Sequence, residues 1–253
     1  MNFLSKVEYK GEDNIGEKVV EALYSNKIVH FTGFDFHCDI LEFYTKLSDN
    51  FPTILNAGEN IEDGNATGSR WISIQYDPNY PMKYRTSKTR HPLHTDNSYV
   101  PIANNITFFF CKAFPPYGGA TIFLDSATLI ELLEMDNKQA LLDGLKTIPV
   151  CFSKTDRNKT MPIITEDTKG LILNYNYACL DKSNTKEAVD LVEEFQDFLD
   201  NRVVMGGIAT PMPLAPGEAV FFHDERLLHG RNAFFTPTPA GRDFLKGVAL
   251  FDQ

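Results

Sequence analysis

Short apolar runs separated by turn-forming residues recur from Trp71 to the end of the chain, and they limit what it can fold into. Runs of this length that are rich in β-branched and aromatic residues are typical of strands. They cover residues 71–76, 105–113, 121–124, 147–152, 170–177, 219–223 and 247–251. The sequence therefore predicts a strand-rich barrel or sandwich.

Helices are predicted around this β-rich region, because apolar residues recur there at helical spacing. The predicted helices cover residues 15–26, 38–48, 126–146 and 184–201. A strand is expected over residues 27–33. Residues 53–69, rich in Asn, Gly and Glu, are predicted to form a long loop of the kind that often covers a binding site. Without an internal repeat or a linker, residues 1–253 are expected to form one domain.

Composition excludes several classes of function. The formal net charge of −10 lacks the basic character of a nucleic-acid binder. We find neither a secretory signal nor an apolar stretch long enough to span a membrane. Cys38, Cys111, Cys151 and Cys179 are widely spaced, which predicts buried thiols of a reducing compartment. We therefore expect a cytoplasmic protein.

The sharpest candidate for a functional site is the segment His94-Thr95-Asp96. Because residues i and i+2 of a strand point to the same face, this spacing predicts that His94 and Asp96 aim an imidazole and a carboxylate at one point. Two histidines and one carboxylate form the facial triad of non-haem iron(II) enzymes, which leaves coordination positions open. An HxD alone also occurs by chance, so a metal site needs a further ligand elsewhere.

That ligand has to come from a remote strand. Residues 216–234 begin with a Pro-Gly turn, continue as an apolar strand and then reach His229, more than half the chain length beyond His94. His223 is the alternative ligand, although its two preceding phenylalanines favour a place in the strand interior. The histidines without a partner at ligand spacing are His30, His37 and His91.

Arg242 enters an apolar segment thirteen residues after His229. A buried cation is costly without an anionic partner, and a guanidinium group matches a carboxylate with two parallel hydrogen bonds. Arg242 is therefore predicted either to anchor a dicarboxylate or to form an internal salt bridge, for instance with Asp125 or Asp243. The sequence leaves both alternatives open.

Taken together, these features resemble the taurine dioxygenase-like superfamily of iron(II)/2-oxoglutarate oxygenases. The resemblance runs from about Arg70 to the C-terminus and depends on four motifs in the family's order. The motifs are His94-Thr-Asp96, residues 115–126 (PPYGGATIFLDS), residues 224–234 (DERLLHGRNAF) and Gly241-Arg242.

This resemblance implies a mainly β fold with flanking helices, a distorted double-stranded β-helix or jelly roll. It implies that His94, Asp96 and His229 bind iron(II), and that Thr121 and Arg242 bind the distal carboxylate of 2-oxoglutarate. The implied reaction uses O2, converts 2-oxoglutarate to succinate and CO2, and hydroxylates a C–H bond. Related halogenases lack the carboxylate ligand, so Asp96 favours hydroxylation over halogenation.

Candidates for binding the primary substrate are cations near the motifs and polar residues beside predicted strands. They are Arg70, Arg90, Asn97, Tyr99, Asn176 and Lys246. Lys246 lies where some relatives hold the anion of their substrate, and it could equally be a solvated lysine at a strand end. We expect a small polar metabolite, such as an amino acid or a related acid. The sequence indicates no oligomeric state.

Other functions remain open. The same iron centre can desaturate, cyclise or cleave a substrate. A catalytically silent jelly-roll binding protein, or a protein whose triad holds inert zinc, would show no dependence on 2-oxoglutarate. A zinc hydrolase commonly carries an HExxH helix, and the sequence contains no such motif.

Overall fold

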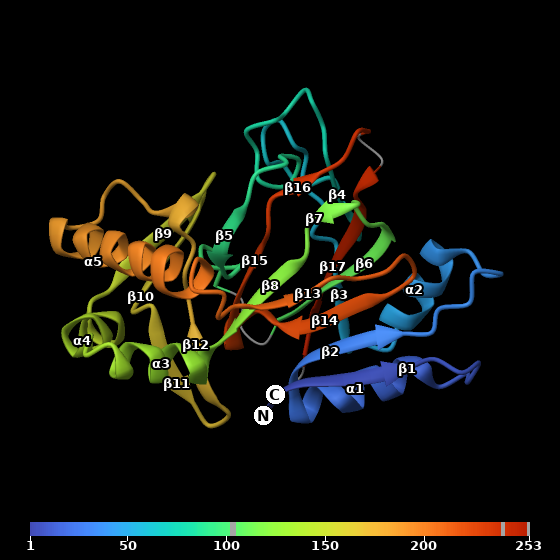
Figure 1. The fold of residues 1–253 in the computed structure, drawn as a ribbon, viewed down its shortest axis with the longest axis horizontal. Helices are drawn as coiled ribbons and strands as arrows, with labels where there is room; N and C mark the ends of the chain where they lie inside the picture. Colours follow the sequence, from blue (N-terminus) through green and yellow to red (C-terminus); the bar gives the residue numbers. More distant parts are fainter. Residues whose placement is uncertain (102–104, 239–240, 252–253) are drawn as a thin grey trace.

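The computed structural model describes residues 1–101, 105–238 and 241–251, and most of its strands belong to two sheets (Figure 1). The major sheet has the order β1 (Asn2–Glu8), β2 (Asn26–Thr32), β14 (Ala219–His223), β6 (Asn105–Ala113), β17 (Asp243–Leu250) and β3 (Thr53–Leu55), and β4 (Ile72–Gln75) also pairs with β17. The minor sheet has the order β13 (Thr210–Met212), β8 (Thr121–Asp125), β15 (Leu227–Arg231) and β5 (His91–His94). The predicted jelly-roll class is confirmed.

Strands β6 and β14 lie inside the major sheet and are apolar on both faces. Phe108 and Phe221 belong to the core beneath the N-terminal helices, whereas Phe109 and Phe222 belong to the core shared with the minor sheet. Since successive side chains of a strand point to opposite faces, a strand buried on both sides needs an unbroken apolar run. The three consecutive phenylalanines in β6 meet that need.

Helices α1 (Ile15–Ser25) and α2 (Ile40–Ser48) cover the outer face of the major sheet (Figure 1). Val19, Leu23 and Tyr44 are fully buried in the core between these helices and the sheet. The helix α1 connects β1 to its parallel neighbour β2, as a parallel pair requires. Strand β1 was not predicted, because its alternating exposed residues carry no continuous apolar signal.

An insert between β8 and β13 covers the outer face of the minor sheet. It contains α3 (Ser126–Met135), α4 (Gln139–Thr147), β9 (Val150–Lys154), β10 (Arg157–Met161), β11 (Ile164–Asp167), β12 (Gly170–Leu173), the 3₁₀ turn η1 (Tyr177–Cys179), α5 (Lys186–Asp197) and the π-helical segment Phe198–Val204. The single helix predicted over residues 126–146 is wrong: Asn137, with a φ of 55°, lies between two helices. The strand predicted over residues 170–177 ends at Leu173.

Two further differences concern the site. The predicted strand 247–251 is in fact β17, which begins at Asp243, so its first half was missed. The predicted loop 53–69 begins with the short strand β3. The remaining elements are the pair β7 (Tyr117–Gly118) and β16 (Phe234–Phe235), and the 3₁₀ turn η3 (Asp224–Arg226) that joins β14 to β15.

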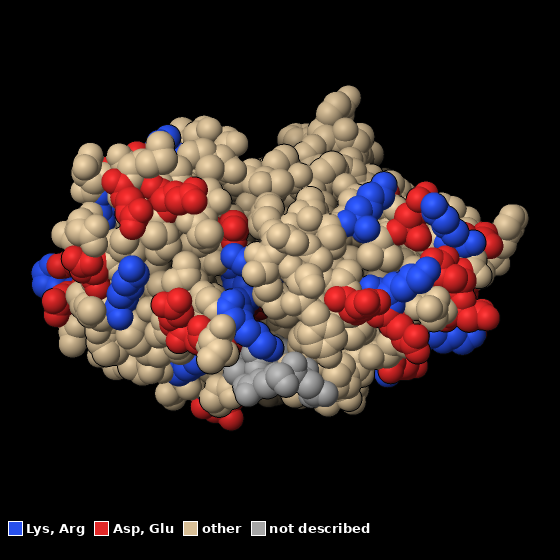
Figure 2. All heavy atoms as spheres, turned by 90° about the horizontal axis from the view of Figure 1, so that it is seen from below, with Lys and Arg blue, Asp and Glu red and all other residues tan. Residues whose placement is uncertain are grey.

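One face of the surface carries charges of both signs. Figure 2 shows Asp and Glu side chains interspersed with Lys and Arg on the face seen from below, without one sign of charge covering it. Among the helices that the structure describes, none is both long and apolar enough to cross a membrane. All four cysteines are free. Cys111 is buried as predicted, whereas Cys151 and Cys179 are half-buried and Cys38 is exposed, so the prediction that every thiol is buried is wrong for these three residues.

Candidate metal centre

Three side chains converge where β5 and β15 pair. His94 ends β5, and it lies directly opposite His229 on the antiparallel strand β15. The Oδ1 atom of Asp96 is 3.6 Å from Nε2 of His94, and its Oδ2 atom is 3.5 Å from Nε2 of His229. The ligand atoms of the three residues all lie within 4.8 Å of one another, so one metal ion could contact all three.

Asp96 does not share a strand with His94. Strand β5 ends at His94, and Asp96 lies in the following turn. The turn is held by two backbone donors: Thr95 N donates to Tyr175 O at 2.7 Å, and Asp96 N donates to the carboxylate of Asp224 at 2.9 and 3.0 Å. The predicted strand alternation is therefore wrong, and the turn brings the carboxylate to the imidazole instead.

The surroundings of His229 and Asp96 favour the protonation states in which these residues bind a metal. The Nδ1 atom of His94 lies 2.8 Å from the carbonyl of Pro92, which can only accept, so Nδ1 donates there and Nε2 is the ring nitrogen that faces Asp96. Burial, and next the charge of His94, hold the pKa of His229 well below its usual value. Burial alone would raise the pKa of Asp96, but Lys246 and then His229 bring it well below the usual range. Neutral imidazoles and an ionised carboxylate are suitable metal ligands.

Lys246 lies beside the triad rather than at a solvated strand end. Its Nζ donates to Oδ2 of Asp96 at 2.6 Å, and its side chain is 12% exposed. It occupies the middle of β17, because that strand begins earlier than predicted. The solvated alternative is therefore wrong.

Two arginines form a second buried group next to the triad. Arg231 follows His229 on β15 by two residues and pairs across the sheet with Thr121 on β8, while Arg242 directly precedes β17. The guanidinium carbons of Arg231 and Arg242 lie 5.1 and 5.3 Å from the ring centroid of Phe234. Two buried cations at one aromatic ring repel each other, which favours an anion between or beside them.

The guanidinium group of Arg242 has no internal salt bridge among the described residues. Its Nε and Nη1 atoms are buried without a hydrogen-bond partner there. Asp125 is paired with Lys27, and Asp243 is paired with Lys112. Burial, and next the charge of Arg231, lower the pKa of Arg242. The predicted alternative of a salt bridge to Asp125 or Asp243 is therefore wrong.

The triad and the arginine pair open on one cavity of about 1060 Å³. Of the residues predicted to bind iron, 2-oxoglutarate or substrate, nine line it: His94, Asp96, His229, Thr121, Arg242, Asn97, Tyr99, Asn176 and Lys246. Asn97 and Tyr99 do so from the turn after β5, not from a strand. The Nδ2 atom of Asn97 is buried and has no hydrogen-bond partner among the described residues.

Two predicted substrate residues do not reach the cavity. Arg70 donates to Thr45 O and forms an ion pair with Asp49 at 2.8 Å. Arg90 forms an ion pair with Asp200 at 2.7 Å. Neither residue is part of the cavity lining, so their closeness in sequence to the motifs does not place them at the site.

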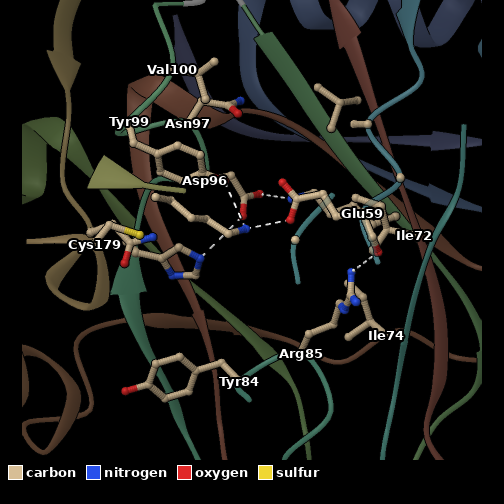
Figure 3. Close-up of a pocket in the computed structure, with 18 of the residues that line it drawn as sticks. Glu59, Ile72, Ile74, Tyr84, Arg85, Asp96, Asn97, Tyr99, Val100 and Cys179 are labelled. Carbon is tan, nitrogen blue, oxygen red and sulfur yellow. Dashed lines mark hydrogen bonds and ion pairs between the residues drawn. The ribbon is translucent and has the colours of Figure 1, made fainter. Parts of the chain in front are cut away.

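Several charged residues of the cavity were not predicted. Glu59, from the segment predicted as a covering loop, accepts from Lys154 Nζ at 2.6 Å and from Arg157 Nη2 at 3.2 Å. Arg85 donates to the backbone carbonyl of Glu59 at 3.2 Å, and Figure 3 shows its side chain reaching toward that carbonyl. Burial raises the pKa of Glu59, but the bonds to Lys154 and Arg157 outweigh it and leave the pKa below its usual value.

The predicted loop 53–69 was the only sequence signal for this cluster. Lys154 and Arg157 belong to the β9–β10 hairpin of the insert, far along the chain from Glu59. Figure 3 shows Glu59 and Tyr99 in the upper part of the view and Tyr84 with Arg85 in the lower part. No local pattern could indicate that these segments meet.

The fold and the site define a class: a jelly-roll protein with two histidines and one carboxylate beside a buried site for an anion. The model of the taurine catabolism dioxygenase TauD, TfdA family matches residues 4–248. The chain belongs to this family of dioxygenases. No curated protein matches the sequence.

Solved structures of similar fold include three oxygenases. An asparagine oxygenase in complex with Fe(II), 3-hydroxyasparagine and succinate is 13% identical, with a TM-score of 0.67 over 94% of this chain and 82% of that chain. PvcB from Pseudomonas aeruginosa is 17% identical, with a TM-score of 0.68 over 98% and 86%. OrfP in complex with Fe, succinate and (3S)-hydroxy-L-Arg is 11% identical, with a TM-score of 0.67 over 96% and 81%. At these identities the likeness establishes the fold.

Proposed function

We propose that this chain is an iron(II)- and 2-oxoglutarate-dependent dioxygenase that hydroxylates a C–H bond of a small polar metabolite, an amino acid or a related acid. The observation that carries the proposal is that a buried metal-ligand triad and a pair of buried arginines open on the same cavity. Bound iron would supply the activation of O2, with 2-oxoglutarate becoming succinate and CO2. Membership of the TauD family supports this reaction class.

The donor set fits the proposed cofactors. His94, Asp96 and His229 would hold iron(II), for which imidazole and carboxylate are suitable ligands. Arg242 and Thr121 would bind the distal carboxylate of 2-oxoglutarate, since the guanidinium group of Arg242 has no anionic partner within the described part of the chain. Arg231 adds a second positive charge there, which strengthens the attraction for a dicarboxylate.

The charges of the cavity support an amino acid or a related acid as substrate. Lys154, Arg157 and Arg85 are cations that suit a carboxylate, and Glu59 is an anion that suits an ammonium group. The carboxylate of Glu59 compensates the charges of Lys154 and Arg157, whereas Arg85 donates to the backbone carbonyl of Glu59. A zwitterionic substrate could replace those bonds. The structures of asparagine oxygenase and OrfP that contain hydroxylated amino acids support the same substrate class.

Alternative outcomes on the same scaffold are desaturation, cyclisation or cleavage of the substrate, and a silent binding protein. We further propose a cytoplasmic location, because the cysteines are free thiols, and a small molecule rather than a nucleic acid as partner, because the chain is acidic.

The test is an anaerobic titration of the apoprotein with iron(II) and then 2-oxoglutarate, recording the weak visible charge-transfer band of the iron chelate. We expect the band in the wild type. In Arg242→Leu, the apparent Kd for 2-oxoglutarate should rise about tenfold to a hundredfold, because a charge-assisted pair worth roughly 1.5–3 kcal/mol is lost. Arg202→Leu, which removes an exposed arginine paired with Asp136, is the control and should leave the Kd unchanged.

Metal binding without a band in the wild type would favour the silent or zinc-holding alternatives. If the band appears, succinate release can then be compared for each amino acid and for its analogues that lack the amino or the carboxyl group. Turnover with the complete amino acids alone supports the substrate class. Equal turnover with the analogues would contradict it.

A further inference from the structure

Asp224 contacts both of the segments that supply the triad. It begins the turn η3 between β14 and β15, is 1% exposed, and comes five residues before His229. We infer that Asp224 is a positioning residue that assembles the metal centre before metal binds, by fixing the backbone at Asp96 and orienting the imidazole of His229. The inference rests on the proposed metal site.

The first contact fixes the turn that carries Asp96. Both carboxylate oxygens of Asp224 accept from the backbone N–H of Asp96, at 2.9 and 3.0 Å, and Oδ2 also accepts from the N–H of Asn97 at 3.2 Å. These bonds hold the turn where β5 has already ended and no strand pairing constrains it. The position of the Asp96 carboxylate therefore depends on Asp224.

The second contact concerns the ring of His229. Its Nδ1 atom is buried, has no hydrogen-bond partner among the described residues, and lies 3.5 Å from Oδ1 of Asp224. Its Nε2 atom faces Asp96 on the other side of the ring. A histidine that binds metal through one nitrogen commonly donates its other N–H to a carboxylate, which fixes both the tautomer and the ring orientation. Asp224 is in place for that role.

The turn that carries Asp224 is itself held firmly. Arg226, 2% exposed, donates from Nη1 and Nη2 to the carboxylate of Asp167 at 2.9 and 2.6 Å, and also to the carbonyl of Gly170 at 2.9 Å. This bidentate pair connects η3 to the β11–β12 hairpin of the insert. Because its turn is fixed, the buried carboxylate of Asp224 can hold the backbone at Asp96 and the ring of His229 in place.

Titration of the apoprotein with Co(II), monitored by calorimetry and by the visible d–d absorption of the bound ion, tests this role without substrate or O2. In Asp224→Asn the Kd for Co(II) should rise about tenfold to a hundredfold, the cost of losing an outer partner of a metal ligand. The d–d spectrum should change as well, because the coordination geometry loosens. Asp125→Asn is the matched control: it removes a carboxylate paired with Lys27 at the end of β8, and it should keep the wild-type Kd and spectrum.

A wild-type Kd and spectrum in Asp224→Asn would overturn the inference while leaving the proposed function intact. If the Kd depends on Asp224 but no band forms with iron(II) and 2-oxoglutarate, the inference stands and the proposed function fails. A wild type that binds no Co(II) would contradict both.

A second measurement covers the case in which Asp224→Asn does not fold. In the ¹⁵N NMR spectrum of the wild-type protein loaded with Zn(II), the imidazole of His229, assigned by its loss in His229→Gln, should carry a slowly exchanging proton on Nδ1. A His229 whose Nδ1 is unprotonated, or whose proton exchanges as fast as that of an exposed histidine, would refute the positioning role of Asp224.

Discussion

His223 and His229 lie on consecutive strands, yet only His229 faces the triad. The Nε2 atom of His223 lies 2.9 Å from the carbonyl of Leu23, so it connects the end of β14 to α1. Because a carbonyl only accepts, Nε2 carries a proton and donates it in this bond. Burial lowers the pKa of His223 to about 4. The sequence left His223 open as a metal ligand, but in the structure its side chain is hydrogen-bonded to the backbone of α1.

The buried His223 predicts a loss of stability in acid. Its pKa is about 4 in the folded chain and near 6.5 in the unfolded chain, so the unfolded state binds the proton first as the pH falls. The stability contribution is complete above pH 6.5 and is lost between pH 6.5 and 4, by about 3 kcal/mol. His223→Gln can keep a bond to Leu23. In this variant, the free energy of unfolding measured with urea should depend less steeply on pH across this range, by the equivalent of about one bound proton. An unchanged slope would contradict the assignment.

At the scale of elements, the close approach of β5 to β15 depends on Gly230. A Cβ atom at this position would lie 2.7 Å from the carbonyl oxygen of His91 and 3.1 Å from that of Pro92. Backbone atoms in a paired strand cannot move aside easily. The absence of a side chain between His229 and Arg231 therefore allows β5 to bring His94 opposite His229.

Gly230→Ala should push β5 away from β15 and separate the two histidines. We expect a loss of about 1–3 kcal/mol in the free energy of unfolding and a weaker affinity for Co(II), by tenfold or more. Chemical denaturation and calorimetry measure the two effects. Gly144→Ala is the control, because its added methyl group would lie 2.7 Å from the side chain of Leu191 in the insert. The idea fails if both variants bind Co(II) as the wild type does.

At the scale of the molecule, the triad joins parts of the chain that only the complete fold brings together. His94 and His229 belong to the minor sheet, Asp96 to the turn after β5, and Lys246, which pairs with Asp96, to the major sheet. The unfolded chain cannot hold these groups within reach of one ion. Metal binding should therefore stabilise the whole fold.

Addition of Co(II) at about a hundred times its Kd should stabilise the apoprotein by roughly 2.7 kcal/mol. For a chain of this size that corresponds to a rise in Tm of about 5–10 °C, which a chelator should reverse. Differential scanning calorimetry measures the shift. His229→Ala should fold and show almost none of it. An equal shift in that variant would mean that the stabilising ion binds elsewhere.

Local pattern predicted much of the architecture. Alternation and helical spacing depend on neighbouring residues, so strands such as β6, β8 and β14 and helices such as α1 were predicted close to their observed bounds. The motif order indicated the family in the same way. Elements whose pattern is diluted by charged residues, such as β1 and the first half of β17, were missed.

Residue types and their spacing were enough to show which side chains can provide the chemistry: two histidines, a carboxylate and an arginine that needs an anion. The partner of each charge became known from the fold alone. In the fold Lys246 pairs with Asp96, whereas Arg70 and Arg90 form ion pairs with acidic residues outside the cavity. Asp224 contacts both segments that carry the metal ligands. The physical reason is that the partner of a buried charge is set by which distant segments meet, and short-range periodicity carries no information about that.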